Sequence, residues 1–111
     1  MQFEDSRLGK AAVVSVAGRV DALSAPIFEA HCQALIDKGD NQLVMDFADL
    51  DYLSSAGLRS LLSLAKKVQA RGGKIVISGA KGVAAEIFTI SGFASLFPMT
   101  ATLEEAAREV L

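Results

Sequence analysis

The segment ADLDYLSSAGLRSLL at residues 48–62 places two hydroxyl groups, on Ser54 and Ser55, directly before a run with helical periodicity. A serine at this position can cap the free N–H groups of the first helical turn, and a serine hydroxyl can also receive a phosphate. One serine is enough for the cap, and the sequence leaves open which of the two supplies it. The other hydroxyl is therefore a candidate for chemistry.

A helical wheel separates the two hydroxyls. Ser54 lies four residues before Leu58, on the apolar side of the expected helix. Ser55 lies four residues before Arg59, on the polar side, so Ser55 is predicted to be the more accessible hydroxyl. Gly57 is costly inside a helix, and we interpret its missing side chain as room for another molecule to approach the backbone.

Other arrangements of reactive residues are weaker. His31 and Cys32 are adjacent on an expected helix, where their side chains diverge by about 100° and cannot hold one metal ion together. Cys32 falls on the apolar side and is predicted to be a core cysteine. No G-x-S-x-G motif is present, and His31 lies in mid-helix, which argues against a serine hydrolase.

Two loops superficially suggest a ligand site. GAKG at 79–82 follows a strand, but it lacks the Lys-Ser/Thr pair of a P-loop, so we interpret it as a plain strand-to-helix turn. Asp46, Asp49 and Asp51 do not have the spacing of an EF-hand loop and are read as ordinary carboxylates. We therefore expect no metal, no catalytic residue, no enzyme activity and no cofactor in the protein itself.

The elements that must position the serines alternate between apolar strands and amphipathic helices. This order, β-β-α-β-α-β-α-β-α, predicts an α/β fold with a mostly parallel sheet of four to five strands, an antiparallel N-terminal strand and about four helices. The expected strands are 2–5, 11–18, 43–47, 74–78 and 96–99. The expected helices are 24–38, 56–71, 82–92 and 102–111.

The loops after the parallel strands should meet at one edge of the sheet. These loops are 18–24, 48–55 and 79–82. Binding concentrates at the carboxyl edge of such sheets. The serines lie at this edge by construction.

Length, net charge and cysteine content limit the possible domain organisation, binding partners and cellular location. A chain of 111 residues is predicted to form one domain, residues 1–111, and its formal net charge of −2 argues against nucleic-acid binding. One cysteine fits a reducing cytoplasm. We expect a cytoplasmic protein, because no secretory signal or membrane span is visible in the sequence.

Three segments carry a resemblance to a known family: GRVDALSAP, LVMDFADLDYLSSAGLRSLL and KIVISGAKGVAAEIFTISGF. They resemble the STAS domain of bacterial anti-sigma factor antagonists, and the resemblance spans essentially the whole chain. YLSSAGL is similar to the family's phosphorylation motif. On that motif Ser55 takes the phosphoacceptor position, while Gly18 and Asp21 match a G-x-x-D loop at the partner interface.

The motif also shows departures. The family's aspartate before the phosphoacceptor is Ser54 here, and its following serine or threonine is Ala56. Ser54 is consequently the second choice as acceptor. The resemblance implies a partner-binding surface that includes Asp21, Ser54, Ser55, Ala56, Gly57 and Arg59.

The implied function is partner switching. An unphosphorylated antagonist of this family binds a GHKL-type serine kinase that is also the anti-sigma factor, and phosphorylation by this ATP-carrying kinase ends the complex. A PP2C-type phosphatase resets the antagonist. An alternative is a soluble STAS accessory subunit of a membrane transporter of the lipid-transport ABC type, a class whose members need not be phosphorylated.

Overall fold

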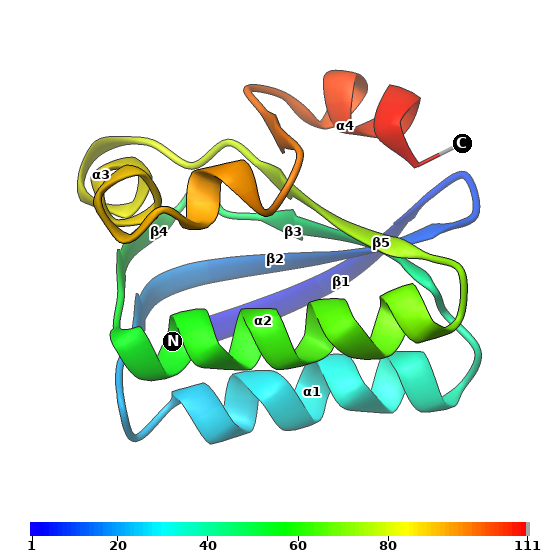
Figure 1. Cartoon of the computed structure of the whole chain (residues 1–111), viewed down its shortest axis with the longest axis horizontal. Helices are drawn as coiled ribbons and strands as arrows, with labels where there is room; N and C mark the ends of the chain where they lie inside the picture. Colours follow the sequence, from blue (N-terminus) through cyan, green and yellow to red (C-terminus); the bar gives the residue numbers. More distant parts are fainter. Residues whose placement is uncertain (111) are drawn as a thin grey trace.

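The computed structural model describes residues 1–110 and shows helices on both faces of a twisted sheet (Figure 1). The strands are β1 (Gln2–Leu8), β2 (Ala11–Val20), β3 (Gln42–Asp46), β4 (Leu50–Leu53), β5 (Lys74–Ser78) and β6 (Met99–Thr100). The helices are α1 (Ala25–Asp37), α2 (Ser55–Ala70), α3 (Gly82–Ser91), α4 (Leu103–Glu109) and a 3₁₀ turn, η1 (Phe93–Ser95).

The main sheet has the order β1-β2-β3-β5-β6, with β4 paired to β2 outside this row. β1 and β2 form an antiparallel hairpin, and every other pairing is parallel. The predicted α/β class, the parallel sheet and the antiparallel N-terminal strand are confirmed. The sheet has six strands rather than four to five, because the segment expected to be the loop 48–55 contains β4.

Strand β2 is long enough to change partners along its length. Residues 12–15 pair with β3, and residues 18–20 pair with β4 after a break in register between Gly18 and Arg19. Gly18 has φ +89° at this break, a conformation that costs glycine little and other residues much. We expected Gly18 to begin a partner loop, whereas the structure places it inside β2.

Helices α1 and α2 cover one face of the sheet (Figure 1). Phe28, Cys32 and Ile36 of α1 are fully buried, which confirms the prediction that Cys32 is a core cysteine. Helix α2 buries Leu61, Leu64 and Val68 on the same side. On the opposite face, α4 packs Ala106 and Val110 over the valines of β2, β3 and β5.

Helix α3 faces the core differently from our expectation. In the sequence Val83, Ile87 and Ile90 are roughly aligned on one side, but Ala84 and Phe88 are the fully buried residues, Ile87 is only partly buried, and Ile90 is 85% exposed. The ring of Phe88 stacks on Phe47 with centroids 6.2 Å apart. Apolar residues lie around most of the circumference of α3, so periodicity alone does not identify the buried face.

The C-terminal edge strand also begins later than expected. The prediction was 96–99, whereas β6 is Met99–Thr100, because Phe93–Ser95 form a 3₁₀ turn and Leu96 caps it. The pairing with β5 nonetheless starts at the carbonyl of Pro98, which accepts a hydrogen bond from Ile77 N at 2.9 Å.

Candidate functional site

The structure assigns the helix cap to Ser54. Its backbone is extended, and its Oγ accepts a hydrogen bond from the backbone N–H of Gly57 at 3.1 Å. The backbone N–H of Ser54 also donates to the carbonyl of Val20 at 2.8 Å. Ser54 is half-buried, and both its backbone N–H and its side-chain hydroxyl are used in hydrogen bonds within the protein.

Ser55 is the first residue of α2 and is exposed, as the helical wheel predicted. Among the described residues its hydroxyl takes part in no hydrogen bond, whereas the hydroxyl of Ser54 is committed to the cap. The free N–H groups of the first turn and the positive end of the helix dipole favour an anion at this position. Ser55 therefore presents a hydroxyl that is accessible and unused.

Gly57 has a different role from the one we expected. It is buried, and a Cβ on this residue would lie 2.5 Å from Leu53 Cδ1 and 3.1 Å from Val20 Cγ1. The space beside its backbone is thus filled by the protein's own side chains. The interpretation that Gly57 opens the backbone to another molecule is wrong, because the glycine lets α2 pack closely on β2 and β4.

Asp21 shapes the loop before α1. Its Oδ1 accepts hydrogen bonds from the backbone N–H of Leu23 at 3.0 Å and of Ser24 at 2.9 Å, and from the Ser24 hydroxyl at 3.0 Å. These bonds, above all that from the Ser24 N–H, hold the pKa of the Asp21 carboxyl below its ordinary value. The Asp21 carboxylate therefore stabilises the conformation of its own loop.

Ser24 precedes α1 but does not cap it through its side chain. A serine followed by proline in the first turn is a typical start of a helix. Pro26 is in the first turn of α1, but the Ser24 hydroxyl makes no cap bond. It instead accepts the N–H of Asp21 at 2.9 Å, so the two residues bind each other reciprocally and close the loop.

Adjacent strand ends bring the two loops together. β2 and β4 run in parallel, and the Val20–Ser54 bond joins the residues at which the loops begin. Figure 1 shows the first turns of α1 and α2 at the same end of the molecule. Asp21 and Ser55 thus lie on neighbouring segments, in agreement with the predicted carboxyl-edge location.

An apolar hollow of about 320 Å³ borders Ser55. It is lined by Tyr52, Leu53, Ser55, Leu58, Ile87, Ile90 and Ser91. A partner's apolar side chain would fit such a surface, whereas a phosphate on Ser55 would place charge at its rim. The sequence analysis did not identify Tyr52 or Ile90 as residues of a binding surface. The one sequence signal for such a surface was that α3 has more apolar residues than a single helix face can bury.

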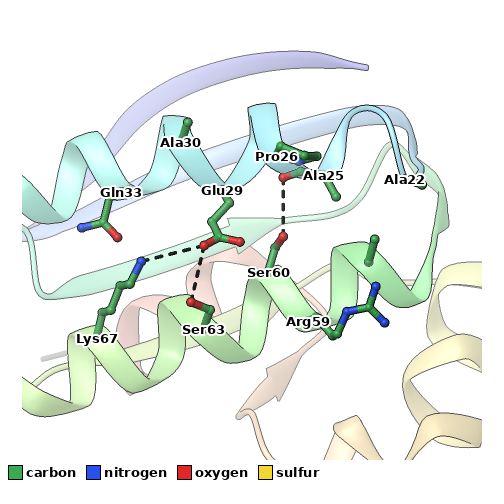
Figure 2. Close-up of a pocket in the computed structure, with 11 residues that line it drawn as sticks. Ala22, Ala25, Pro26, Glu29, Ala30, Gln33, Arg59, Ser60, Ser63 and Lys67 are labelled. Carbon is green, nitrogen blue, oxygen red and sulfur yellow. Dashed lines mark hydrogen bonds and ion pairs between the residues drawn. The ribbon is translucent and has the colours of Figure 1, made fainter.

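A second hollow, of about 600 Å³, lies between α1 and α2 (Figure 2). Small side chains such as Ala25, Ala30 and Ser60 keep the helices from filling it, and Ala56 and Arg59 line it near the start of α2. Lys67 Nζ lies 3.8 Å from Glu29 Oε2 across the groove. Arg59 lines this hollow and Ser55 lines the smaller one, although both residues lie near the start of α2.

Exposed leucine and isoleucine side chains extend the apolar surface. Leu23 in the loop before α1 is 86% exposed, and Ile27 in the first turn of α1 is 59% exposed. Their burial would be favourable on binding, by roughly 25 cal/mol per Å² of apolar area. Sequence reasoning did not select either residue.

The residues tested for metal or nucleophilic chemistry have structural partners. His31 Nε2 lies 2.7 Å from Asp5 Oδ1, and the ring stacks on Phe3. Cys32 is fully buried, and burial, with the nearby charges of Asp5 and Glu29, raises its pKa to about 12. Within residues 1–110 no three His, Cys, Asp or Glu side chains gather in a way that could hold a metal.

The 79–82 loop is the expected strand-to-helix turn, with Lys81 at the N-terminal boundary of α3. None of the helices in the described part of the chain has both the length and the apolar character needed to cross a membrane.

Comparison with known proteins identifies the family. The model of the STAS domain family matches residues 3–106. The chain belongs to the STAS domain family. This STAS chain is 40% identical over 95 residues, which is 86% of the chain and 82% of its relative, to BtrV of Bordetella bronchiseptica, which its name assigns to the anti-sigma factor antagonists.

Solved structures agree on the fold. An anti-sigma factor antagonist from Mycobacterium paratuberculosis is similar with a TM-score of 0.88 and 25% identity, covering 98% of this chain and 92% of that one. The phosphorylated form of SpoIIAA, a Bacillus cell fate determinant, is similar with a TM-score of 0.75 and 21% identity, covering 97% and 98%. The latter likeness shows the shared STAS fold alone.

Proposed function

We propose that this STAS protein is an anti-sigma factor antagonist that works by partner switching, with Ser55 as its phosphoacceptor. The observation that carries the proposal is the division of labour between the two serines. Ser54 supplies the helix cap, and the exposed hydroxyl of Ser55 is left unused at the rim of an apolar hollow. The names of BtrV and of the Mycobacterium protein support the assignment.

The partner proposed is a GHKL-type serine kinase that is also the anti-sigma factor, and it supplies the ATP. Ser55 Oγ attacks the γ-phosphorus of that ATP, and the hydroxyl proton passes to a base of the kinase. The bond from this phosphorus to the β–γ bridging oxygen breaks, and ADP leaves with its electrons. A PP2C-type phosphatase reverses the modification when water attacks the phosphorus, releasing inorganic phosphate and restoring the hydroxyl.

Charge and burial explain how the phosphate would act. It adds about −1.5 to −2 charges near neutral pH. At the first residue of α2 this charge is compatible with the helix, because the helix dipole favours it. It is incompatible with an apolar partner surface in the hollow of Tyr52, Ile87 and Ile90. The fold should persist while the complex dissociates.

Two substitutions test the acceptor. Ser55→Ala should bind the kinase as the parent does and should not be phosphorylated. Ser55→Asp should bind more weakly, since it imitates part of the phosphate charge. Phosphosite mapping by mass spectrometry, after incubation with ATP and kinase, gives the direct result. Phosphorylation of Ser55→Ala to the parent's extent would move the acceptor elsewhere, with Ser54 the next residue to test.

The partner class needs a separate experiment. The tagged protein is used to capture binding partners from an extract of the source organism, and these are identified by mass spectrometry. A GHKL-type ATPase that phosphorylates the purified chain supports partner switching. Recovery of a lipid-transport ABC complex without such a kinase would favour the transporter-subunit alternative instead.

A further inference from the structure

Arg59 is an exposed cation one helical turn after Ser55 in α2. Residues four positions apart are neighbours on a helix surface, with Cβ atoms about 5–6 Å apart. Helical side chains lean toward the N-terminus, so an arginine leans toward the residue four positions before it. Figure 2 shows the Arg59 side chain extending toward the end of α2 at which the helix begins.

The guanidinium of Arg59 has no partner of its own within residues 1–110: no ion pair or side-chain hydrogen bond includes it. Two other cations already have partners. Lys67 lies near Glu29, and Arg19 lies over the ring of Tyr52 at 4.4 Å. The first turn of α2 also contains no acidic residue. The start of the helix therefore combines unused N–H groups, the positive end of its dipole and a free guanidinium.

We propose that Arg59 is the intramolecular counter-ion of a phosphate on Ser55. This inference rests on the proposed function, because it needs Ser55 to be the modified residue. A guanidinium can donate two parallel hydrogen bonds to a phosphate, which fixes the orientation of the phosphate as well as attracting it. Arg59 is thus a positioning residue, and it holds the phosphate over the first turn of α2.

A contact between Arg59 and the Ser55 phosphate would change the charges that a partner protein contacts on this surface. In the unmodified protein Arg59 offers a free cation next to the α1–α2 groove. In the phosphorylated protein the guanidinium is engaged by the phosphate, so a carboxylate of the partner loses its counter-charge at the moment when the new anion appears. Phosphorylation would then remove an attraction and add a repulsion in one step.

The test uses the full chain with phosphoserine installed at position 55 during translation, so that no kinase is needed. Phosphorus NMR then gives the second pKa of the phosphate in the parent, in Arg59→Gln and in Arg59→Lys. An exposed ion pair at this spacing should lower this pKa by about 0.15 to 0.4 unit in the parent relative to Arg59→Gln. Arg59→Lys should restore part of the shift, because it keeps the charge but not the planar fork.

Lys66→Gln is the matched control, since Lys66 is an exposed cation three turns from Ser55 on the same helix. It removes the same net charge and should leave the pKa at the parent value. Asp21 and Asp51 are the carboxylates on the adjoining segments, and they are unchanged in all variants.

An equal second pKa in the parent and in Arg59→Gln would overturn the role of Arg59, and so would an equal shift in Lys66→Gln. Neither result bears on whether a kinase uses Ser55. Phosphosite mapping decides that point separately, and a phosphate found on another residue would reject the proposed function by its own measurement.

Discussion

The Oγ of Ser54 lies 3.1 Å from the backbone nitrogen of Gly57 and accepts its hydrogen bond, which leaves the neighbouring hydroxyl of Ser55 outside the cap. Two residues that look equivalent in the sequence therefore have separate tasks. Ser54 stabilises the helix, and Ser55 is available to a second molecule. This separation allows the stability of the protein and its proposed modification to be changed independently.

The first prediction follows from the cap. Ser54→Ala should lower the free energy of unfolding by about 1 kcal/mol, because the N–H of Gly57 loses its acceptor. Ser55→Ala should change it by only a few tenths of a kcal/mol, the usual effect of an exposed substitution. Ser54→Asp is the control that keeps an acceptor at the cap. Urea denaturation measures all three, and a larger loss in Ser55→Ala than in Ser54→Ala would contradict the assignment.

A second prediction separates the charge of Asp21 from its shape. Asp21→Ala removes the acceptor for the N–H groups of Leu23 and Ser24, so the loop should loosen and kinase binding should weaken. Asp21→Asn keeps a side-chain oxygen for these bonds and should bind close to the parent. Titration calorimetry gives both dissociation constants. Equal weakening by the two variants would show that the partner reads the charge itself.

The lowered pKa of Asp21 gives the same loop a pH dependence. A carboxyl whose pKa is depressed by folding contributes stability above its ordinary value, and this contribution is lost as the pH falls through the folded value. The ordinary value is 3.8. NMR titration of the Asp21 carboxyl should therefore show a midpoint below 3.8 in the parent, and a midpoint at or above it would contradict the loop geometry.

The fourth prediction concerns the apolar hollow beside Ser55. Ile90 is 85% exposed, so Ile90→Ser should leave the fold intact while removing an apolar contact to the partner. We expect kinase affinity to fall about tenfold, the effect of losing roughly 1.4 kcal/mol of binding energy. Val83→Ser is the matched control, because Val83 is also exposed on α3 but does not line the hollow. Similar affinities for the two variants would remove this hollow from the interface.

Much of the fold could be predicted from the sequence because the three apolar strands at 11–18, 43–47 and 74–78 alternate with amphipathic helices. The location of the serines followed from the parallel topology. β4 could not be predicted, since its four residues pair with the far end of β2 only after β2 has left β3. That long-range choice leaves no local pattern.

The properties of the site residues could likewise be predicted where they depend on local spacing, and could not where they depend on contacts between distant segments. The exposure of Ser55 followed from helical spacing, which is a local property. The role of Gly57 did not, because the side chains that occupy the space beside it, Val20 and Leu53, come from two different strands. The exposure of Ile90 likewise depends on which side of α3 meets Phe47, and a helix with apolar residues around most of its circumference does not encode that choice.

The last prediction uses Cys32 as a probe of the core. Its pKa is about 12 in the folded protein, raised by burial from an ordinary value of 9.0. A raised pKa contributes stability that is fully present below 9.0 and is lost as the pH rises toward 12, because the unfolded thiol releases its proton first. The free energy of unfolding should therefore fall by up to about 1.4 kcal/mol per pH unit from this group alone. Urea denaturation at several pH values between 8 and 11 measures the slope.

Cys32→Ala provides the control. This variant should be less stable at every pH because of the lost packing, but its stability should fall less steeply as the pH rises, since only the thiol differs between the two proteins. Identical slopes would show that the thiol of Cys32 ionises equally in the folded and unfolded states.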